Sequence, residues 1–337
     1  MQKEAEEYDL GRQRDLINRA SINLGMNRAF NKLGVQVSRY HPPEALIGLE
    51  VPMPNGPQIV DMGEYERLWH EYKSHPLDAL VGNIWDQGTK FSATLKDIDL
   101  TGFRADNAYV WQTRGVPFAD FALSALWAER SDSFHLLTRT QESGDFGVEC
   151  IRIDGRLWSR DLIDSILEIT FMIENLPSGA LDTMTVVDVG AGYGRLLTRL
   201  ADVTGSPRLL GVDGVALSTA ICRAYIRYLR VDSRVSVLSL SEADKLEGGI
   251  DLATNIHSFS EMSLEAVCWW LDWLVDRGTK YLFLVPNQPG PSLNDGTDLA
   301  PYISQRGFKL KVQRMKYADP LIGQHSLHQA HYYLFTR

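Results

Sequence analysis

Val186-Val187-Asp188-Val189-Gly190-Ala191-Gly192-Tyr193-Gly194-Arg195 is the most informative stretch of this 337-residue chain. β-Branched residues followed by an acid and by alternating glycines predict a buried strand that runs into a tight turn. Leucines at helical spacing after Arg195 predict that the turn opens a helix. Glycines allow the sharp turn, and they let a ligand lie against the main chain, where the amide groups of the helix start face it.

The spacing of the glycines indicates the class of ligand. A dinucleotide-binding turn reads Gly-x-Gly-x-x-Gly, which from Gly190 would put the third glycine at position 195, where the chain has Arg195. The order present is an acid, Asp188, followed by glycines at 190, 192 and 194. A second acid, Asp213, follows the next predicted strand, where a carboxylate can accept hydrogen bonds from both hydroxyls of a ribose. The glycine spacing therefore argues against a nicotinamide dinucleotide.

This pattern resembles motif I of the class I S-adenosylmethionine-dependent methyltransferases. The resemblance implies S-adenosyl-L-methionine as the cofactor and S-adenosyl-L-homocysteine as the product. Asp188 then suits the methionine ammonium group and Asp213 suits the ribose, while an adenine contact is expected near Ser241, after the third strand. The expected cofactor-binding residues are Asp188, Gly190, Gly192, Tyr193, Gly194, Asp213, Ser241 and Asn255.

Predicted strands and helices alternate through the second half of the chain. Strands are expected at 184–189, 208–213, 234–240, 250–256, 279–285, 308–317 and 331–336. Helices are expected at 194–202, 216–230, 263–276 and 297–305. This alternation predicts an α/β, Rossmann-like core, a mostly parallel seven-stranded sheet with helices on both faces, which ends in an antiparallel pair. The methyltransferase domain is expected over 156–337, with a helix capped by Ser159, and a mainly helical N-terminal region over 1–155.

Composition limits the partners. The net charge of −9 argues against a nucleic-acid substrate, because phosphate binding needs a basic face. Three widely spaced cysteines, Cys150, Cys222 and Cys268, indicate free thiols in a reducing compartment. A charged N-terminus and the lack of a long apolar run predict a cytoplasmic protein without a signal peptide or a membrane segment.

Four stretches narrow the resemblance. They lie at 159–166, 190–195, 251–262 and 316–320, and each is similar to a segment of the sugar O-methyltransferases of antibiotic and glycan gene clusters. A weaker similarity to the same family lies at 109–112. The resemblance implies an enzyme, a transferase of secondary metabolism such as antibiotic biosynthesis. Its acceptor would be a small molecule, namely a sugar, a sugar nucleotide or a glycosylated metabolite, and the methylated group would be a hydroxyl.

His257 is the expected catalytic residue, at the end of the fourth strand of the core. A sugar hydroxyl must lose its proton as it attacks a methyl group, and an imidazole that titrates near neutrality suits the role of general base. Glu261, four residues later, is expected to hydrogen-bond the ring and to stabilise its protonated form. The alternative is that His257 caps the following helix or contacts the cofactor. Asn287 and Gln288, after the fifth strand, are candidates for recognising hydroxyl groups.

The means of activating the acceptor, and the acceptor itself, stay open at the level of sequence. Mg²⁺ is the rival activator, with Glu261 as the available carboxylate, although no metal is expected. His325, His328 and His331 lie three residues apart on a loop that enters a strand, which favours structural or substrate-facing roles over a metal site. The acceptor could instead be a non-sugar natural-product intermediate methylated on O, N or C, because the fold does not determine it. The N-terminal region is expected to act as a lid, to bind the acceptor or to make homo-oligomer contacts.

Overall fold

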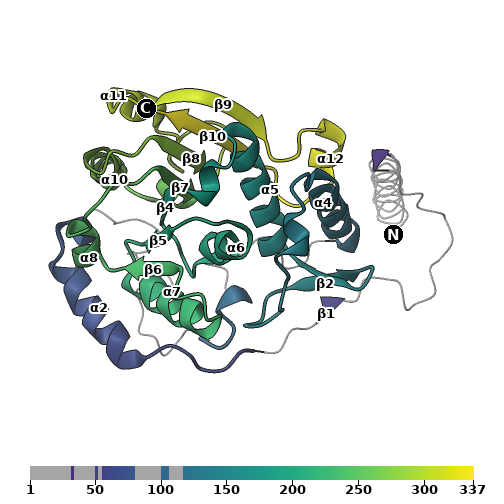
Figure 1. Ribbon diagram of the computed structural model, residues 1–337, viewed down its shortest axis with the longest axis horizontal. Coiled ribbons are helices and arrows are strands. Elements are labelled where there is room, and N and C mark those ends of the chain that lie inside the picture. The colour runs from purple at the N-terminus through teal and green to yellow at the C-terminus, as the bar shows by residue number, and fades with distance from the viewer. Residues whose placement is uncertain (1–31, 34–49, 52–54, 80–99, 106–116) are drawn as a thin grey trace, which may run out of the picture.

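The structure is a computed structural model of the chain, and it describes residues 32–33, 50–51, 55–79, 100–105 and 117–337 (Figure 1). Residues 109–112, which carry the weaker similarity to the sugar O-methyltransferases, lie outside the described residues, as does most of the segment 1–54. None of the helices within the described ranges is long and apolar enough to cross a membrane.

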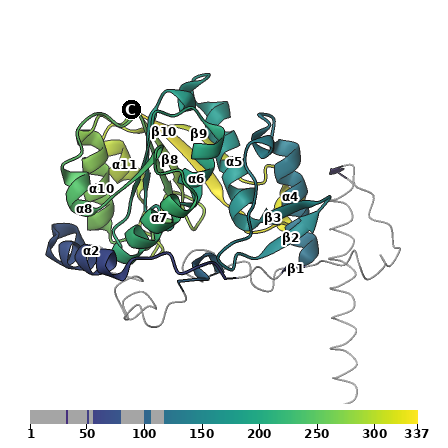
Figure 2. The same cartoon turned by 60° about the horizontal axis from the view of Figure 1, so that its bottom comes forward.

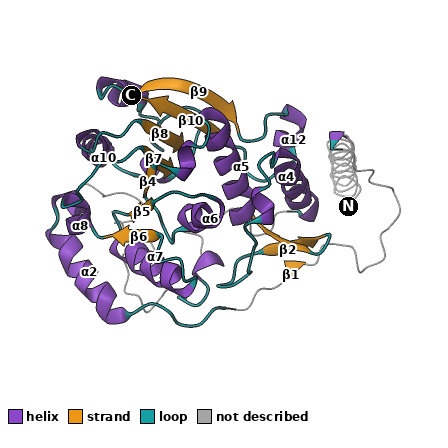
Figure 3. Ribbon diagram, viewed as in Figure 1, coloured by secondary structure: helices purple, strands orange, loops and turns teal. Residues whose placement is uncertain are grey.

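A seven-stranded sheet forms the centre of the molecule, in the order β6-β5-β4-β7-β8-β10-β9 (Figure 3). Its strands are β4 (Thr185–Val189), β5 (Arg208–Val212), β6 (Val235–Leu238), β7 (Leu252–Ile256), β8 (Tyr281–Val285), β9 (Lys309–Met315) and β10 (His331–Thr336). The five strands from β4 to β8 pair in parallel, and β10 lies antiparallel to both β8 and β9. The predicted α/β, Rossmann-like architecture, a mostly parallel seven-stranded sheet with an antiparallel pair at one end, is confirmed.

Helices cover both faces of this sheet, because alternate residues of each strand point to opposite sides. Val186 packs in the same cluster as α5 (Arg160–Asn175) and α6 (Arg195–Val203). The next residue, Val187, packs in the cluster that contains α10 (Leu264–Asp276), and α7 (Ala216–Tyr228) contributes to both clusters. Burial on both faces explains why the strands read as nearly continuous apolar runs.

α5 starts where the sequence predicts. The hydroxyl of the N-cap residue Ser159 accepts a hydrogen bond of 3.0 Å from the amide of Leu162, which supplies a partner for one of the free amides at the helix start. The predicted apolar stripe is buried, but so are several polar residues on the other side of the helix, namely Arg160, Asp161, Asp164, Ser165 and Glu168. Buried charges of this kind must find partners inside the protein.

The described part of the N-terminal region is not only helical. α4 (Phe118–Ser131) is accompanied by a small antiparallel sheet of β1 (Glu50–Val51), β2 (Cys150–Ile153) and β3 (Arg156–Ser159). A boundary between residues 155 and 156 would fall at the turn that joins β2 to β3. α4 packs on α5 and shares a hydrophobic cluster with the large sheet, so the segment 117–155 is part of the same core.

The structure differs from the predicted elements after β6. The strand expected over 234–240 ends at Leu238, because Ser239 begins a short helix, α8 (Leu240–Asp244), in a reciprocal capping box with Glu242. Ser241 therefore lies in a helix and not in a loop. The helix expected over 297–305 is shorter, and α11 spans Ala300–Gln305. Two further short helices, α9 (Ser258–Glu261) and α12 (Pro320–Gln324), were not predicted.

Candidate active site

The candidate site lies at the carboxyl ends of β4, β5 and β7. In the order of the sheet, β5 and β7 flank β4, and the chain leaves β4 toward β5 but returns to its other side with β7. A reversal of this kind opens a crevice beyond the strand ends, which is where open α/β sheets bind their ligands. The glycine turn follows β4, Asp213 follows β5 and His257 follows β7, so the sheet brings the predicted residues together.

The glycine turn depends on left-handed backbone conformations. Gly190, Gly192 and Gly194 have φ values of 77°, 56° and 91°, which side chains other than glycine adopt only at a cost. The amides of Gly190 and Ala191 both donate to the carbonyl of Val212, at 2.8 and 3.1 Å. These two bonds hold the turn against the end of β5.

Two of these glycines are also required by protein packing. A Cβ atom at Gly190 would lie 2.0 Å from Ser258 Oγ, and one at Gly194 would lie 2.9 Å from Cys222 Sγ. The space beside Gly190 is therefore filled by the start of α9, and not only reserved for a ligand. Gly192 is partly exposed and its amide donates to Asp213 Oδ2 at 2.9 Å.

Asp188 and Asp213 place two carboxylates at the ends of adjacent strands. Asp188 is buried and accepts a hydrogen bond of 2.6 Å from the hydroxyl of Thr254. Asp213 is partly exposed, and its two oxygens accept from the amides of Gly192 and Val215, at 2.9 and 2.8 Å. Asp213 therefore orders the turn while it keeps acceptor capacity for a ligand.

Both carboxyl groups are harder to ionise than usual. Burial raises the pKa of Asp188 to about 6, although the Thr254 hydroxyl acts in the opposite direction. Burial also raises the pKa of Asp213 to about 6, against the two backbone amides that favour its charged form. A ligand with a positive charge beside them would favour the ionised forms, so the site suits a cation better than an anion.

The side chains of Tyr193 and Asn255, which the sequence predicts as cofactor contacts, point into the protein. Tyr193 is buried under Phe103, with ring centroids 5.6 Å apart, and its hydroxyl bonds to the carboxylate of Asp161. Asn255 is fully buried, where its amide group donates to Val189 O at 2.8 Å and its Oδ1 accepts from the amide of Phe259 at 2.9 Å. The expectation that these side chains contact a cofactor does not fit these contacts, since both serve the packing behind the turn.

His257 has an unusual backbone and a buried ring nitrogen. Its φ of 67° lies in the left-handed region, held by a hydrogen bond of 2.7 Å from its amide to Val285 O. The residue begins α9 but makes no side-chain capping bond. Its Nδ1 is buried and has no hydrogen-bond partner among the described residues, although the residue as a whole is partly exposed.

Glu261 is not the partner that the sequence predicts for this ring. Its Oε1 accepts a hydrogen bond of 3.3 Å from Asn287 Nδ2, and both residues are partly exposed. The ring of His328, from the loop before β10, lies beside His257, with centroids 6.1 Å apart. Among the described residues, the groups that act on His257 therefore include Arg160, Asp164 and His328, and not Glu261 as expected.

Burial and a neighbouring cation explain the electrostatics of His257. Arg160 Nε donates to Asp164 Oδ2 at 3.1 Å, and Lys316 also pairs with Asp164 while it donates to His328 O at 3.1 Å. Burial and the charge of Arg160 lower the pKa of His257 to about 3, and the same two causes lower the pKa of His328 to about 4. Both rings are neutral at pH 7.

The three clustered histidines of the sequence separate in space. His325 ends α12 and His331 begins β10, whereas His328 lies beside His257. Within the part of the chain that the structure describes, no group of three or more His, Cys, Asp or Glu side chains is placed to hold a metal ion.

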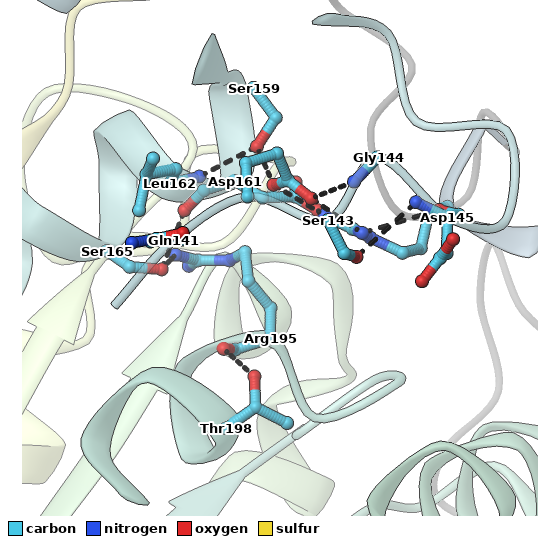
Figure 4. A network of polar contacts seen from close by, with 12 residues as sticks. Gln141, Ser143, Gly144, Asp145, Ser159, Asp161, Leu162, Ser165, Arg195 and Thr198 are labelled. Atoms are coloured by element: carbon cyan, nitrogen blue, oxygen red, sulfur yellow. Dashed lines mark hydrogen bonds and ion pairs between the residues drawn. The ribbon is translucent and has the colours of Figure 1, made fainter. Parts of the chain in front are cut away.

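A buried ion network connects the N-terminal region to the glycine turn, and the sequence does not reveal it. The guanidinium group of Arg104 donates to Glu142 at 2.9 and 3.0 Å and to Asp161 at 2.9 and 3.2 Å. Asp161 in turn holds the hydroxyl of Tyr193. Nearby, Arg195 reaches from the start of α6 to Ser165 of α5, at 2.8 Å (Figure 4). Only the first-turn position of Asp161 in α5 was visible in the sequence.

α2 (Met62–Ser74) supplies two further residues that the sequence does not reveal. The hydroxyl of Tyr72 donates to the carbonyl of Asp213 at 3.1 Å, and the carboxylate of Glu71 accepts from the amide and the hydroxyl of Ser241, at 2.9 and 2.7 Å. The polar groups of Ser241, expected near adenine, thus bind a residue of the N-terminal region.

No protein-family model matches the sequence, and no curated protein matches it. Among solved structures, the chain is similar to a SAM-dependent methyltransferase from Aquifex aeolicus, with 19% identity and a TM-score of 0.37 over 51% of this chain and 89% of that one. It is similar to magnesium protoporphyrin IX methyltransferase from Synechocystis PCC 6803, with 14% identity and a TM-score of 0.40 over 64% of this chain and 96% of that one. It is also similar to the cyclopropane synthase MmaA2 from Mycobacterium tuberculosis, with 12% identity and a TM-score of 0.39 over 55% of this chain and 87% of that one. At these scores the likenesses carry no weight, and the fold rests on the strand order.

Proposed function

We propose that this chain is an S-adenosylmethionine-dependent methyltransferase. One observation supports this most strongly: the carboxylates of Asp188 and Asp213 stand at the ends of adjacent parallel strands, on either side of a turn with three left-handed glycines. A dinucleotide carries a pyrophosphate, which the two carboxylates would repel. S-Adenosylmethionine carries an ammonium group, a sulfonium and a ribose, all of which suit carboxylate neighbours.

The residues present fit this cofactor. Asp188 would hold the methionine ammonium group and Asp213 would accept from the ribose hydroxyls, while the amides of Gly190, Ala191 and Gly192 keep the turn in place through their bonds to Val212 and Asp213. The bound cofactor supplies an electrophilic methyl group. The remaining chemistry, which is to place the acceptor and to remove its proton, falls to side chains at the end of β7.

We propose that the acceptor is a hydroxyl of a sugar or of a glycosylated small molecule, and that His257 takes its proton. A neutral imidazole can accept a proton, and the Nδ1 of His257 is not committed to any described residue. Burial, and after it the charge of Arg160, oppose protonation of the ring in the free enzyme and lower the pKa of His257. In the reaction, however, the imidazole gains a positive charge in the step in which the methyl donor loses one, so the total charge of the site does not change.

Glu261 and Asn287 have a different role in this proposal. They bond to each other and are partly exposed, and because the amide group of Asn287 already donates to Glu261 and Asn294, the pair presents carboxylate and amide oxygens as acceptors. Such a pair suits the recognition of neighbouring hydroxyl groups on a sugar ring. His257 then acts without a carboxylate that orients its ring.

Binding and transfer are tested separately. Calorimetry with S-adenosylhomocysteine is expected to show binding to the wild type, with NAD⁺ as the control ligand that does not bind. Transfer is measured with S-adenosylmethionine labelled on the methyl group against a panel of sugars, sugar nucleotides and glycosylated metabolites, with matched amines and non-sugar phenols. Binding of NAD⁺ in place of S-adenosylhomocysteine would refute the cofactor, and label that appears only on the non-sugar acceptors would refute the acceptor class.

A further inference from the structure

The C-terminal turn of α2 lies at the edge of the expected cofactor crevice. α2 runs along α7 and α8 in both views (Figures 1 and 2), and the contacts of these helices agree. Tyr72 is buried at this contact, where its hydroxyl shares a hydrogen bond of 2.8 Å with Thr219 and donates to the carbonyl of Asp213. The end of α2 is thereby fixed beside the residue that would bind the ribose.

Glu71 lies one residue before this anchor and faces the end of β6. Its Oε1 accepts two hydrogen bonds from Ser241, one from the amide and one from the hydroxyl. A carboxylate can accept about four hydrogen bonds, so these two leave capacity on the group. The side chain is partly exposed and can be reached by a ligand.

Glu71 is held in its charged form. Burial opposes ionisation, but hydrogen bonds from Ser239 and Ser241 and the charge of Arg223 outweigh it and keep the pKa of Glu71 below its ordinary value. Arg223 itself donates to Glu242, Glu64 and the carbonyl of Val237. The arginine therefore stabilises the charge of Glu71 from a distance, while its own hydrogen bonds go to these other groups.

The other carboxylates at this end of β6 are committed elsewhere. Glu242 accepts from the amide of Ser239 at 2.7 Å and pairs with Arg223. Asp244 pairs with His75 at 2.9 Å. At the position where an adenine contact is expected, the core has Ser241, and both its amide and its hydroxyl already donate to Glu71. Glu242 and Asp244 are thus paired with Arg223 and His75, whereas within the described part of the chain Glu71 accepts its hydrogen bonds from neutral serines.

The expected path of the cofactor would bring its base next to this carboxylate. If the ribose lies on Asp213 at the end of β5, the base extends toward the neighbouring strand, β6, whose end is about 4.8 Å away across the sheet. Adenine carries one exocyclic amino group, which can only donate. A charged acceptor at this place would distinguish adenine from purines without that group.

We propose that Glu71 accepts a hydrogen bond from the 6-amino group of the cofactor's adenine, so that helix α2, and not the Rossmann-like core, selects the base. This inference rests on the proposed function, because it needs an adenosyl cofactor in the crevice. It gives α2 a defined task in cofactor binding, in addition to its packing on α7 and α8.

The test uses two ligands that differ in one group. Calorimetry measures the dissociation constants of S-adenosylhomocysteine and of its analogue in which hydrogen replaces the 6-amino group. The wild type is expected to bind the amino form about 10- to 100-fold more tightly, the usual value of a hydrogen bond to a charged group. In Glu71→Ala this ratio is expected to fall below about threefold, because the amino form loses affinity and the analogue does not.

Control variants separate this role from a structural one. Glu64→Gln removes a carboxylate of the same helix that pairs with Arg223 and Arg227, at 3.4 and 2.8 Å, and it should leave the ratio unchanged. Should Glu71→Ala fail to fold, Glu71→Gln is used, and its ratio is expected to lie between the wild-type and threefold values, since a neutral acceptor forms a weaker bond.

Three outcomes overturn the inference. A wild-type ratio near one means that the 6-amino group is not recognised. In Glu71→Ala, an unchanged ratio with both affinities unchanged means that another group recognises it. An equal loss of affinity for both ligands, which also leaves the ratio unchanged, means that Glu71 only positions Ser241. If the wild type binds neither ligand, the proposed function itself fails, and this result is distinct from the other three.

Discussion

Replacement of Gly190 by alanine tests how the glycine turn is built. The backbone there has a φ of 77°, which costs an L-residue about 1–2 kcal/mol. The new Cβ would also lie 2.0 Å from Ser258 Oγ and 2.4 Å from Ser258 Cβ. Ser258 cannot easily turn away, because its Oγ accepts from Asn255 at 2.7 Å and its Cβ is fixed to the start of α9.

The structure sets the size of the effect. Overpacking a filled site costs about 1–3 kcal/mol, so Gly190→Ala should lower the free energy of unfolding by about 2–5 kcal/mol in total. Gly179 provides a matched control, because its φ of 71° is similar and nothing lies within 4 Å of its Cβ position. Gly179→Ala should therefore cost only the backbone part, about 1–2 kcal/mol.

Urea denaturation followed by circular dichroism measures both values, and a double-mutant cycle isolates the clash. Ser258→Gly removes the atoms that the new Cβ would meet, so the double variant should be more stable than the sum of the single effects by about 1–3 kcal/mol. Equal costs at Gly190 and Gly179, or additive behaviour of the double variant, would refute the reasoning that Ser258 fills the space beside the turn.

Four further predictions concern the site and the buried network beside it. Asp213→Asn should weaken S-adenosylmethionine binding about 10- to 100-fold in calorimetry, because a carboxamide is a weaker and less versatile acceptor; unchanged affinity would contradict this. Asp188 and Asp213, each with a pKa raised to about 6, are ionised above that pH, so affinity for the cationic cofactor should rise between pH 5 and 7, and a flat profile would count against it. His257→Ala should slow transfer by about 10²–10⁴-fold with cofactor affinity retained. Because the pKa of His257 is about 3, the kcat of the wild type should not fall between pH 8 and 5. EDTA should have no effect on transfer, whereas loss of activity with EDTA and recovery with Mg²⁺ would assign activation to a metal. Arg104→Met leaves the buried carboxylate of Asp161 without its cation, although Glu142 keeps Arg199, and it should lower the free energy of unfolding by about 3–5 kcal/mol; a loss below 1 kcal/mol in urea would show that the network is not needed for stability.

The core of the fold could be predicted from the sequence because its signals are local. The strand, the glycine turn and the helix from Val186 to Leu200 each show their own pattern, and the same is true of β5 followed by Asp213. Right-handed crossovers then leave few ways to order the strands. Asp188 and Asp213 came from the same rule, because ligand residues of open α/β sheets follow the carboxyl ends of the strands.

Short elements and side-chain directions were harder to predict. α8 is too short for helical periodicity to show in the sequence. Its N-cap and first residue follow β6 directly, so the sequence predicts them as the end of that strand. Tyr193 and Asn255 stand at the right positions along the chain, but their side chains turn inward. Their directions depend on partners from other segments, Asp161 for Tyr193 and Val189 for Asn255.

The sequence by itself determined the parallel sheet, the turn after β4 and the two carboxylates that flank it, since each depends on residues within one strand–turn–helix unit. Only the tertiary structure decided which distant side chains complete the site. It separated Glu261 from the ring of His257, placed Arg160 and His328 around that ring, and brought Glu71 to Ser241 across 170 positions of the chain. The reason is physical: a charged side chain can satisfy its hydrogen bonds with many partners, and the packing of whole helices and strands determines which partner lies within reach.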